Sequence, residues 1–336
     1  MSSGSHSPAT RSLNKYGMAE QASPRRRRTC GQHFKKFWWA YLLAFIAVAL
    51  VVVLPVIYVG FPKMAQDQVS AATAEIISVK ITNPTPTSFH VVQDGFSDSD
   101  SSFHPFLDAF NVSTSIAGSA AYGMVTLPGL TSGAHVPVHV EQDVQILDLQ
   151  AFADYNIKVL TSETFEQRLN GTTTLTLGAL PATSVSYDKT VTMNGFNLFP
   201  GFNISCLKID TTAPHGQPNI NGTVFVPNPS SIAVEFGNVT YNTYIGDTMV
   251  GNTTIENFFL QPGNHSYWFT GYTNTLEVLG LVSKYPGGIL PMTIKGNSSV
   301  ANGQHLTYYE AALAHDIHNL ELNLKEAAAT KECVQP

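Results

Sequence analysis

The hydrophobic pattern separates one long apolar segment from a long region of short alternating segments. No charged residue lies between Lys36 and Lys63, and the 25 residues from Phe37 to Phe61 are predominantly apolar. A helix rises about 1.5 Å per residue and the hydrocarbon core of a bilayer is about 30 Å thick. The pattern therefore predicts a transmembrane helix over residues 37–61; the alternative, a buried core helix, is disfavoured by this length and by the aromatic residues at both ends.

After this helix, apolar residues recur at every second position in short runs. Ile77, Val79 and Ile81 alternate with polar residues, and a second such run begins at Ile232 and ends at Phe236. Gly, Pro, Asn and Asp separate these runs. This pattern is typical of antiparallel strands joined by turns. We therefore expect an all-β ectodomain.

Several landmarks occur twice in the same order, which indicates an internal repeat. Asn83-Pro84 and Asn228-Pro229 each follow one apolar run and precede another, and in both copies a sequon, a Pro-Gly pair and a further glycine (Gly171 or Gly296) come later. The repeat predicts two tandem β-sandwich domains at residues 74–207 and 208–325, with a short helix near 307–315 and a loose C-terminus at 326–336.

Charge is distributed unequally on the two sides of the apolar segment. Residues 1–63 have a net charge of +8, and residues 64–336 have a net charge of −14. Because basic residues stay on the cytosolic side, the N-terminus should be cytosolic and residues 64–336 luminal or extracellular. The apolar segment exceeds the roughly 7–15 residues of a cleavable signal, so it predicts an uncleaved signal anchor. We expect residues 1–36 to form a disordered basic tail.

The tail has two features that concern lipids. Four consecutive arginines suit anionic lipid head groups, although a nuclear-localisation or nucleic-acid patch is an alternative for such a run. The acidic ectodomain would repel phosphate backbones, so no nucleic-acid partner is expected. The four consecutive arginines of the tail are Arg25, Arg26, Arg27 and Arg28.

Cys30 precedes the predicted helix by seven residues and is either a site of reversible acylation or an unmodified thiol.

The predicted luminal side contains eight N-x-S/T sequons, whereas the N-terminal tail contains none. This distribution agrees with passage through the secretory pathway, although some sequons arise by chance in a Thr-rich and Asn-rich sequence. The predicted glycosylation sites are Asn111, Asn170, Asn203, Asn221, Asn238, Asn252, Asn264 and Asn297. Cys206 and Cys333 share the same oxidising side and can form a disulfide if the fold brings them together.

Motifs for catalysis or cofactor binding are absent from the sequence. There is no nucleophile elbow, phosphate loop, dinucleotide fingerprint or His-Glu-x-x-His. His315 and His318 have the spacing of two metal ligands on one helical turn, but no further ligand is near in sequence, so solvated surface histidines are the preferred interpretation. Asp94, Asp98 and Asp100 resemble half of a calcium loop that lacks its glycine and distal glutamate. We expect no metal, no cofactor and no enzymatic activity.

The first copy contains additional residues from Asp94 to Phe110, which we interpret as a surface loop. Phenylalanines alternate with acidic residues there, a composition that suits contact with a partner or a membrane surface. The phenylalanines are Phe96, Phe103, Phe106 and Phe110.

The segment from Gly222 to Tyr241, followed by Gly246-Asp247 and Gln261-Pro262-Gly263, resembles the group-2 late-embryogenesis-abundant domain, also called the water-stress and hypersensitive-response domain. This resemblance covers roughly residues 74–325 and implies immunoglobulin-like or fibronectin-III-like sandwiches. The whole layout is similar to a fungal single-span membrane protein family of uncharacterised function. Its relatives imply a vacuolar rather than a plasma membrane. The resemblance supplies no catalytic residues.

Two functions follow from these features. The first is a non-catalytic, membrane-anchored ectodomain that binds a protein or lipid partner or senses the state of the lumen. The second is a lipid carrier or membrane tether with an apolar groove along both sandwiches. A hydrolase is a third possibility that no nucleophile–base pair supports.

Overall fold

The computed structural model describes residues 30–336 except residues 215, 286, 331 and 336, with side chains from Phe37 onward apart from that of Ala328. The predicted arginine cluster therefore lies outside the described residues, and so does the side chain of Cys30. The chain divides into two compact units, the first ending at Leu54 and the second running from Pro55 to Pro336. Strands predominate, with one N-terminal apolar helix, and this confirms the predicted fold class.

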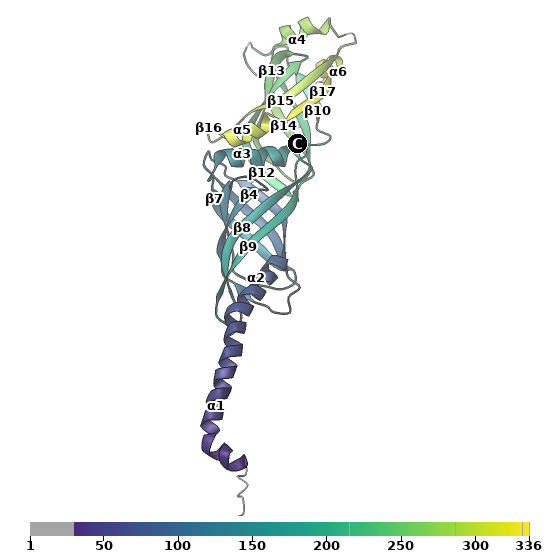
Figure 1. Ribbon diagram of the computed structural model, residues 1–336. Coiled ribbons are helices and arrows are strands. Elements are labelled where there is room, and N and C mark those ends of the chain that lie inside the picture. Colours follow the sequence, from purple (N-terminus) through teal and green to yellow (C-terminus); the bar gives the residue numbers. More distant parts are fainter. Residues whose placement is uncertain (1–29, 215, 286, 331, 336) are drawn as a thin grey trace, which may run out of the picture. The chain divides into compact units, whose positions relative to one another are not determined.

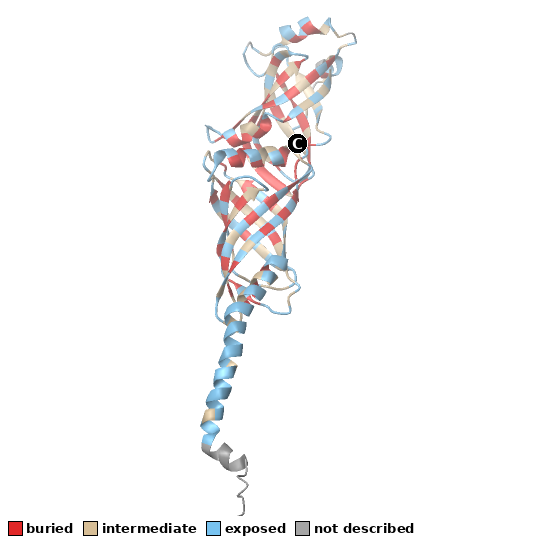
Figure 2. Cartoon of the chain, in the orientation of Figure 1, coloured by how far each residue is buried: buried red, intermediate tan, exposed pale blue. Residues whose placement is uncertain are grey.

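Helix α1 (Cys30–Pro55) contains most of the predicted transmembrane segment. Its backbone departs from helical geometry at Phe37 (φ −122°, ψ 19°), and residues 30–36, predicted to be disordered, are helical. None of the side chains from residue 37 to residue 60 is buried (Figure 2). By its length and composition this apolar helix could cross a membrane. Past Pro55, which lacks a backbone donor, the helix widens into a π-helical turn, η1 (Val56–Gly60).

Helix α2 (Phe61–Ala71) is an element that the sequence analysis did not anticipate. Phe61, Ala65 and Val69 recur every four residues and are buried on one face. This face packs against Leu175 and Val185 of the first β region. The residues that follow the apolar helix are therefore part of the core of the first lobe rather than a linker.

The buried ammonium group of Lys189 fixes the C-terminal end of α2. Its Nζ donates to the carbonyl oxygens of Val69 at 2.5 Å, Ser70 at 3.0 Å and Ala72. The last carbonyls of a helix have no intrahelical partner, and a cation there is favoured by the helix dipole. Burial lowers the pKa of Lys189.

The first lobe comprises β1 to β9 with α2 and α3 (Leu149–Thr161). One set of its strands pairs in the order β1-β2-β7, and the other in the order β5-β4-β8-β3-β6, with β9 beside β8. The strands are β1 (Thr73–Thr82), β2 (Ser88–Asp98), β3 (Phe106–Leu107), β4 (Phe110–Ile116), β5 (Gly123–Leu127), β6 (Leu130–Thr131), β7 (Val136–Gln145), β8 (Thr164–Thr176) and β9 (Thr183–Asn194).

The second lobe comprises β10 to β17 with three short helices (Figure 1). Its long strands form one continuous sheet in the order β10-β11-β14-β13-β12-β15-β17. The elements are β10 (Asn203–Ile209), β11 (Ile220–Asn228), β12 (Ile232–Ile245), β13 (Thr248–Leu260), β14 (Gly263–Thr273), α4 (Thr275–Val282), β15 (Ile289–Ala301), β16 (Gln304–His305), α5 (Thr307–Leu313), β17 (Ile317–Asn323) and α6 (Leu324–Ala329). The predicted helix near 307–315 and the strand after it are confirmed.

The two lobes share one sheet and one hydrophobic core. Strand β1 pairs in parallel with the start of β12, from Val79 opposite Ile232 to Ile81 opposite Val234. Helix α3 contacts α5, and Phe152 of α3 lies 4.8 Å from Tyr308 of α5, measured between ring centroids. The lobes therefore belong to one compact unit instead of standing as separate modules.

The predicted domain limits differ from the strand pairing at two places. The limit between residues 207 and 208 falls inside β10, which pairs with β11 and thus belongs to the second lobe. The predicted loose C-terminus contains most of α6, and Cys333 is bonded to Cys206 of β10. Strands β10 and β11 are consecutive in the chain but lie on opposite sides of the predicted limit, whereas the disulfide, expected if the fold brought its cysteines together, joins residues 127 positions apart.

The repeated glycines occupy matching places in the two lobes. Gly171 of β8 lies opposite Val112 of β4, and Gly296 of β15 lies opposite Tyr241 of β12. A Cβ atom at Gly171 would lie 2.5 Å from a backbone oxygen, and one at Gly296 would lie 2.4 Å from another. Close backbone approach thus requires glycine in both copies.

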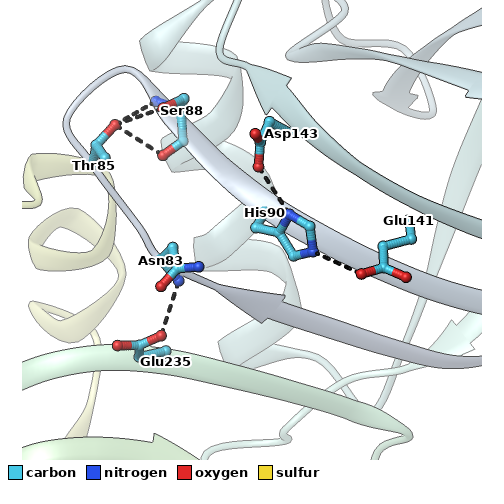
Figure 3. A network of polar contacts seen from close by, with 7 residues as sticks. All are labelled: Asn83, Thr85, Ser88, His90, Glu141, Asp143 and Glu235. Atoms are coloured by element: carbon cyan, nitrogen blue, oxygen red, sulfur yellow. Dashed lines mark hydrogen bonds and ion pairs between the residues drawn. The ribbon is translucent and has the colours of Figure 1, made fainter.

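The two Asn-Pro landmarks have different roles. Asn228 is buried, and its side chain accepts hydrogen bonds from Ser230 and donates one to the carbonyl of Ile232. Asn83 instead has a φ of +50°, and its backbone N–H donates to Glu235 of β12 at 2.9 Å (Figure 3). The second landmark organises its own turn, whereas the first connects the two lobes.

Candidate ligand-binding cavity

The second lobe encloses a cavity of about 340 Å³. Residues from β10 to β15, β17, α4 and α6 line it, so the continuous sheet curls around the space. Protein interiors are normally close-packed, and a volume of this size falls within the range of small-molecule sites. The cavity is therefore the strongest candidate for a binding site in the described part of the chain.

The cavity wall is aliphatic and aromatic apart from hydroxyl groups. None of its lining residues is Asp, Glu, His, Lys, Arg or Cys. Its polar side chains are Tyr241 and five threonines: Thr211, Thr243, Thr253, Thr273 and Thr275. Such a lining suits an apolar ligand and offers neither a charge partner nor a nucleophile–base pair.

Strand register places the threonines in the half of the cavity nearer α4. Thr243 lies opposite Gly251, which lies opposite Thr273, the last residue of β14 before α4. At the other end, Ile204 lies opposite Val224, and no threonine lines the wall at this level. The cavity thus has a wholly apolar base and a hydroxyl-bearing upper half.

The hydroxyl of Tyr241 belongs to a buried hydrogen-bond network and is therefore not free to bind a ligand. It donates to Asp316 Oδ2 at 2.9 Å, and His318 Nε2 lies 2.8 Å from Asp316 Oδ1. Burial and the adjacent Asp316 raise the pKa of Tyr241 well above its usual value of about 10. Asp316 is fully buried, and neither it nor His318 lines the cavity.

This network corrects the interpretation of His318 as a solvated surface residue. His318 lies on β17, its side chain is 10% exposed, and Phe202 stacks on its ring at a centroid distance of 3.8 Å. His315 is exposed, as expected. Asp316 and His318 are two residues apart at the start of a strand, so strand alternation, rather than helical spacing, was the signal that could have paired them.

Helix α4 lies beside the upper half of the cavity. Asn274 caps it by accepting from the N–H of Glu277 at 3.3 Å, and Val278 and Leu281 are buried. Leu279 lines the cavity and is also 60% exposed, so the cavity reaches the surface here. Its neighbour Leu276 is 82% exposed.

A disulfide connects the two edge regions of the curled sheet. Cys206 lies on β10, and Cys333 follows α6, which contacts both β10 and β17. The bond joins residues 127 positions apart. It holds the C-terminal segment beside an edge strand of the cavity.

The other polar cluster of note is an exposed stripe on β2 and β7. His90 lies 2.8 Å from Asp143 and 3.7 Å from Glu141 (Figure 3), and His139 lies 2.7 Å from Asp94. Within the described residues, no group of three or more His, Cys, Asp or Glu side chains could hold a metal ion. The stripe therefore consists of histidines paired with carboxylates across two strands.

The predicted contact loop is only partly a loop. Residues 94–98 belong to β2, and Phe110 is a core residue of β4, 9% exposed, so neither can act as a flexible contact. Phe96 is half-buried and stacks on His135 at 3.7 Å between ring centroids. Phe103 and Phe106 are 47% and 43% exposed. The alternation that buries Phe110 was not evident because the segment has no regular period.

The eight predicted glycosylation asparagines all lie in strands. Seven are exposed and Asn221 is half-buried, so they occupy outward positions of the sheets. Glycosylation at these sites stays a prediction.

Comparisons with known proteins identify one domain and no function. No curated protein matches the chain. A solved structure, "Crystal Structure of the Periplasmic Chaperone SfaE", is 13% identical and covers 70% of this chain and 96% of its own, with a TM-score of only 0.18. Residues 120–243 match a family model described as "Protein of unknown function (DUF3712)". This domain runs from the first lobe into β12 of the second, and the chain thus contains a DUF3712 domain of unknown function.

Proposed function

We propose that this protein is a non-catalytic, single-pass membrane protein whose ectodomain binds a lipid chain in the cavity of the second lobe. The supporting observation is the cavity itself, about 340 Å³ in volume and lined by apolar groups and hydroxyls. Charge asymmetry supports a cytosolic N-terminus and a luminal or extracellular ectodomain, with a vacuolar membrane suggested by resemblance.

The cavity favours lipid binding within one lobe over a groove along both. Its lining residues all belong to the second lobe. In the first lobe, the apolar pocket has a volume of only about 60 Å³, and a second pocket of about 290 Å³ is lined mainly by polar residues that include Asp98 and Asp100. The exposed leucines of α4 provide an apolar edge beside the cavity, along which a lipid chain can enter. The absence of ionisable side chains other than Tyr241 from the wall argues for binding rather than catalysis.

The test uses the full-length protein in phosphatidylcholine nanodiscs. A hexadecyl chain carrying a diazirine is added, activated by light, and its attachment sites are mapped by peptide mass spectrometry. We expect labelled peptides from β10 to β15. Val224→Phe should reduce this labelling several-fold, because the larger side chain enters the cavity, whereas Leu147→Phe, at an exposed position of the first lobe, should not. Labelling confined to α1 would refute lipid binding by the ectodomain.

A second candidate function is contact with a protein or membrane through the segment after β2. Phe103 and Phe106 are the exposed aromatic residues there. Replacing both by serine should weaken co-purification of such a partner without lowering the unfolding midpoint. Unchanged capture would exclude this segment as the contact.

A further inference from the structure

Thr243 carries an unusual hydroxyl group. It lies on β12 between Tyr241 and Ile245, all three of which line the cavity, and it is 8% exposed. Its Oγ1 is buried and has no hydrogen-bond partner in the described structure. A buried hydroxyl without a partner carries a desolvation penalty, so a threonine at this inward position requires a compensating contact.

We propose that the cavity takes a single-chain amphiphile with an uncharged, hydrogen-bonding head group, and that Thr243 Oγ1 bonds to that head. This inference rests on the proposed function and specifies its ligand. The chain would occupy the apolar base near Ile204 and Val224, and the head would lie in the half nearer α4.

Three of the other wall hydroxyls already have partners. Thr273 Oγ1 donates to the carbonyl of Val250 at 3.3 Å, Thr275 Oγ1 accepts from Asn219 Nδ2 at 3.4 Å, and the hydroxyl of Tyr241 donates to Asp316.

Thr211 is exposed and Thr253 is half-buried, and neither hydroxyl is both buried and unpartnered. Among the described wall residues, Thr243 thus combines a buried side chain with an unpartnered hydroxyl, and rotation about its Cα–Cβ bond can turn that hydroxyl toward a ligand.

The same wall discriminates against an ionised head group. A carboxylate or phosphate drawn into this cavity would lose its hydration and meet no Lys, Arg or His among the lining residues. Burial of an unpaired charge is strongly unfavourable. An alcohol or glycerol ester can instead accept or donate one hydrogen bond while its chain fills the apolar base.

The experiment measures competition against the photoreactive hexadecyl probe with the full-length protein in nanodiscs. The competitors are 1-monopalmitoylglycerol and palmitate at pH 8. The variants are Thr243→Val and the control Thr192→Val, at an exposed position of β9 outside the cavity. Each competitor partitions into the bilayer equally for every variant. The ratio of competitor concentrations that halve the labelling in two variants therefore reports the effect of the substituted residue alone.

We expect monopalmitoylglycerol to compete at least tenfold better than palmitate in the wild type. Thr243→Val should weaken that competition roughly fivefold to tenfold, the value of one buried hydrogen bond. Thr192→Val should change neither the competition nor the labelling by the probe. If the probe labels the cavity but Thr243→Val has no effect on competition, or palmitate competes equally well, the inference is wrong while the proposed function stands. Absence of cavity labelling would overturn the proposed function instead.

Discussion

Lys189 is the residue on which the attachment of α2 depends most directly. Replacing it with methionine keeps most of the side-chain volume but leaves the carbonyls of Val69, Ser70 and Ala72 without their donor. We expect the free energy of unfolding to fall by about 2–4 kcal/mol, since buried acceptors would lose a charged partner. Denaturant unfolding measures this loss.

The matched control for that variant is Lys158→Met, because Lys158 is exposed on α3. Its unfolding midpoint should stay within experimental error of the wild type. Equal effects of the two substitutions would show that the three carbonyl contacts do not stabilise the fold.

The His139–Asp94 pair makes the stability of the fold dependent on pH. Its hydrogen bond raises the pKa of His139, and the same bond, with a second from Ser78, lowers the pKa of Asp94. The contribution of His139 is complete below its unfolded pKa of about 6.5 and is lost as pH rises through the raised folded value. That of Asp94 is complete above about pH 4 and is lost as pH falls through the lowered value.

The pair should therefore stabilise the fold most between about pH 4 and 6.5. In His139→Gln, the melting temperature should be lower than that of the wild type in this window, and the two should converge above it. A constant difference between the two proteins at every pH would contradict the assignment. Both side chains are more than half exposed, so the difference should also shrink at high salt.

At the scale of elements, the C-terminal segment is held by a covalent bond as well as by packing. Cys206→Ser should reduce the free energy of unfolding by about 2–4 kcal/mol, because a cross-link over 127 residues restricts the unfolded chain. Reductant should destabilise the wild type by a similar amount and leave the variant unchanged. A wild type indifferent to reductant would contradict a stabilising role.

The elements also show where sequence reasoning was sufficient. Apolar length alone predicted the helix within Phe37–Ala71, and alternation predicted strands such as β1 and β12. The sequence did not predict helix α2 because its apolar face consists of only three residues. These residues are buried because they pack against Leu175 and Val185. Short amphipathic helices of this kind are decided by packing.

At the scale of the whole molecule, the predicted topology can be tested in sealed vesicles with their cytosolic face outward. Protease should remove a tag at the N-terminus and spare one at the C-terminus, since basic residues concentrate before the span. Glycosidase should increase the electrophoretic mobility of the protein, and Asn→Gln changes at all eight sequons should abolish this shift. Detergent-treated vesicles provide the control. Protection of the N-terminal tag would reverse the orientation.

Residue order alone was enough to determine the apolar helix, the charge asymmetry, the strand-rich region after that helix and the repeated landmarks, because each is a pattern of residue types along the chain. The cavity, the unpartnered hydroxyl of Thr243 and the Tyr241–Asp316–His318 network depend on how distant strands meet. An inward threonine looks the same in a sequence whether it faces a packed core or an open space. Only the curling of β10 to β17 around one volume decides between them.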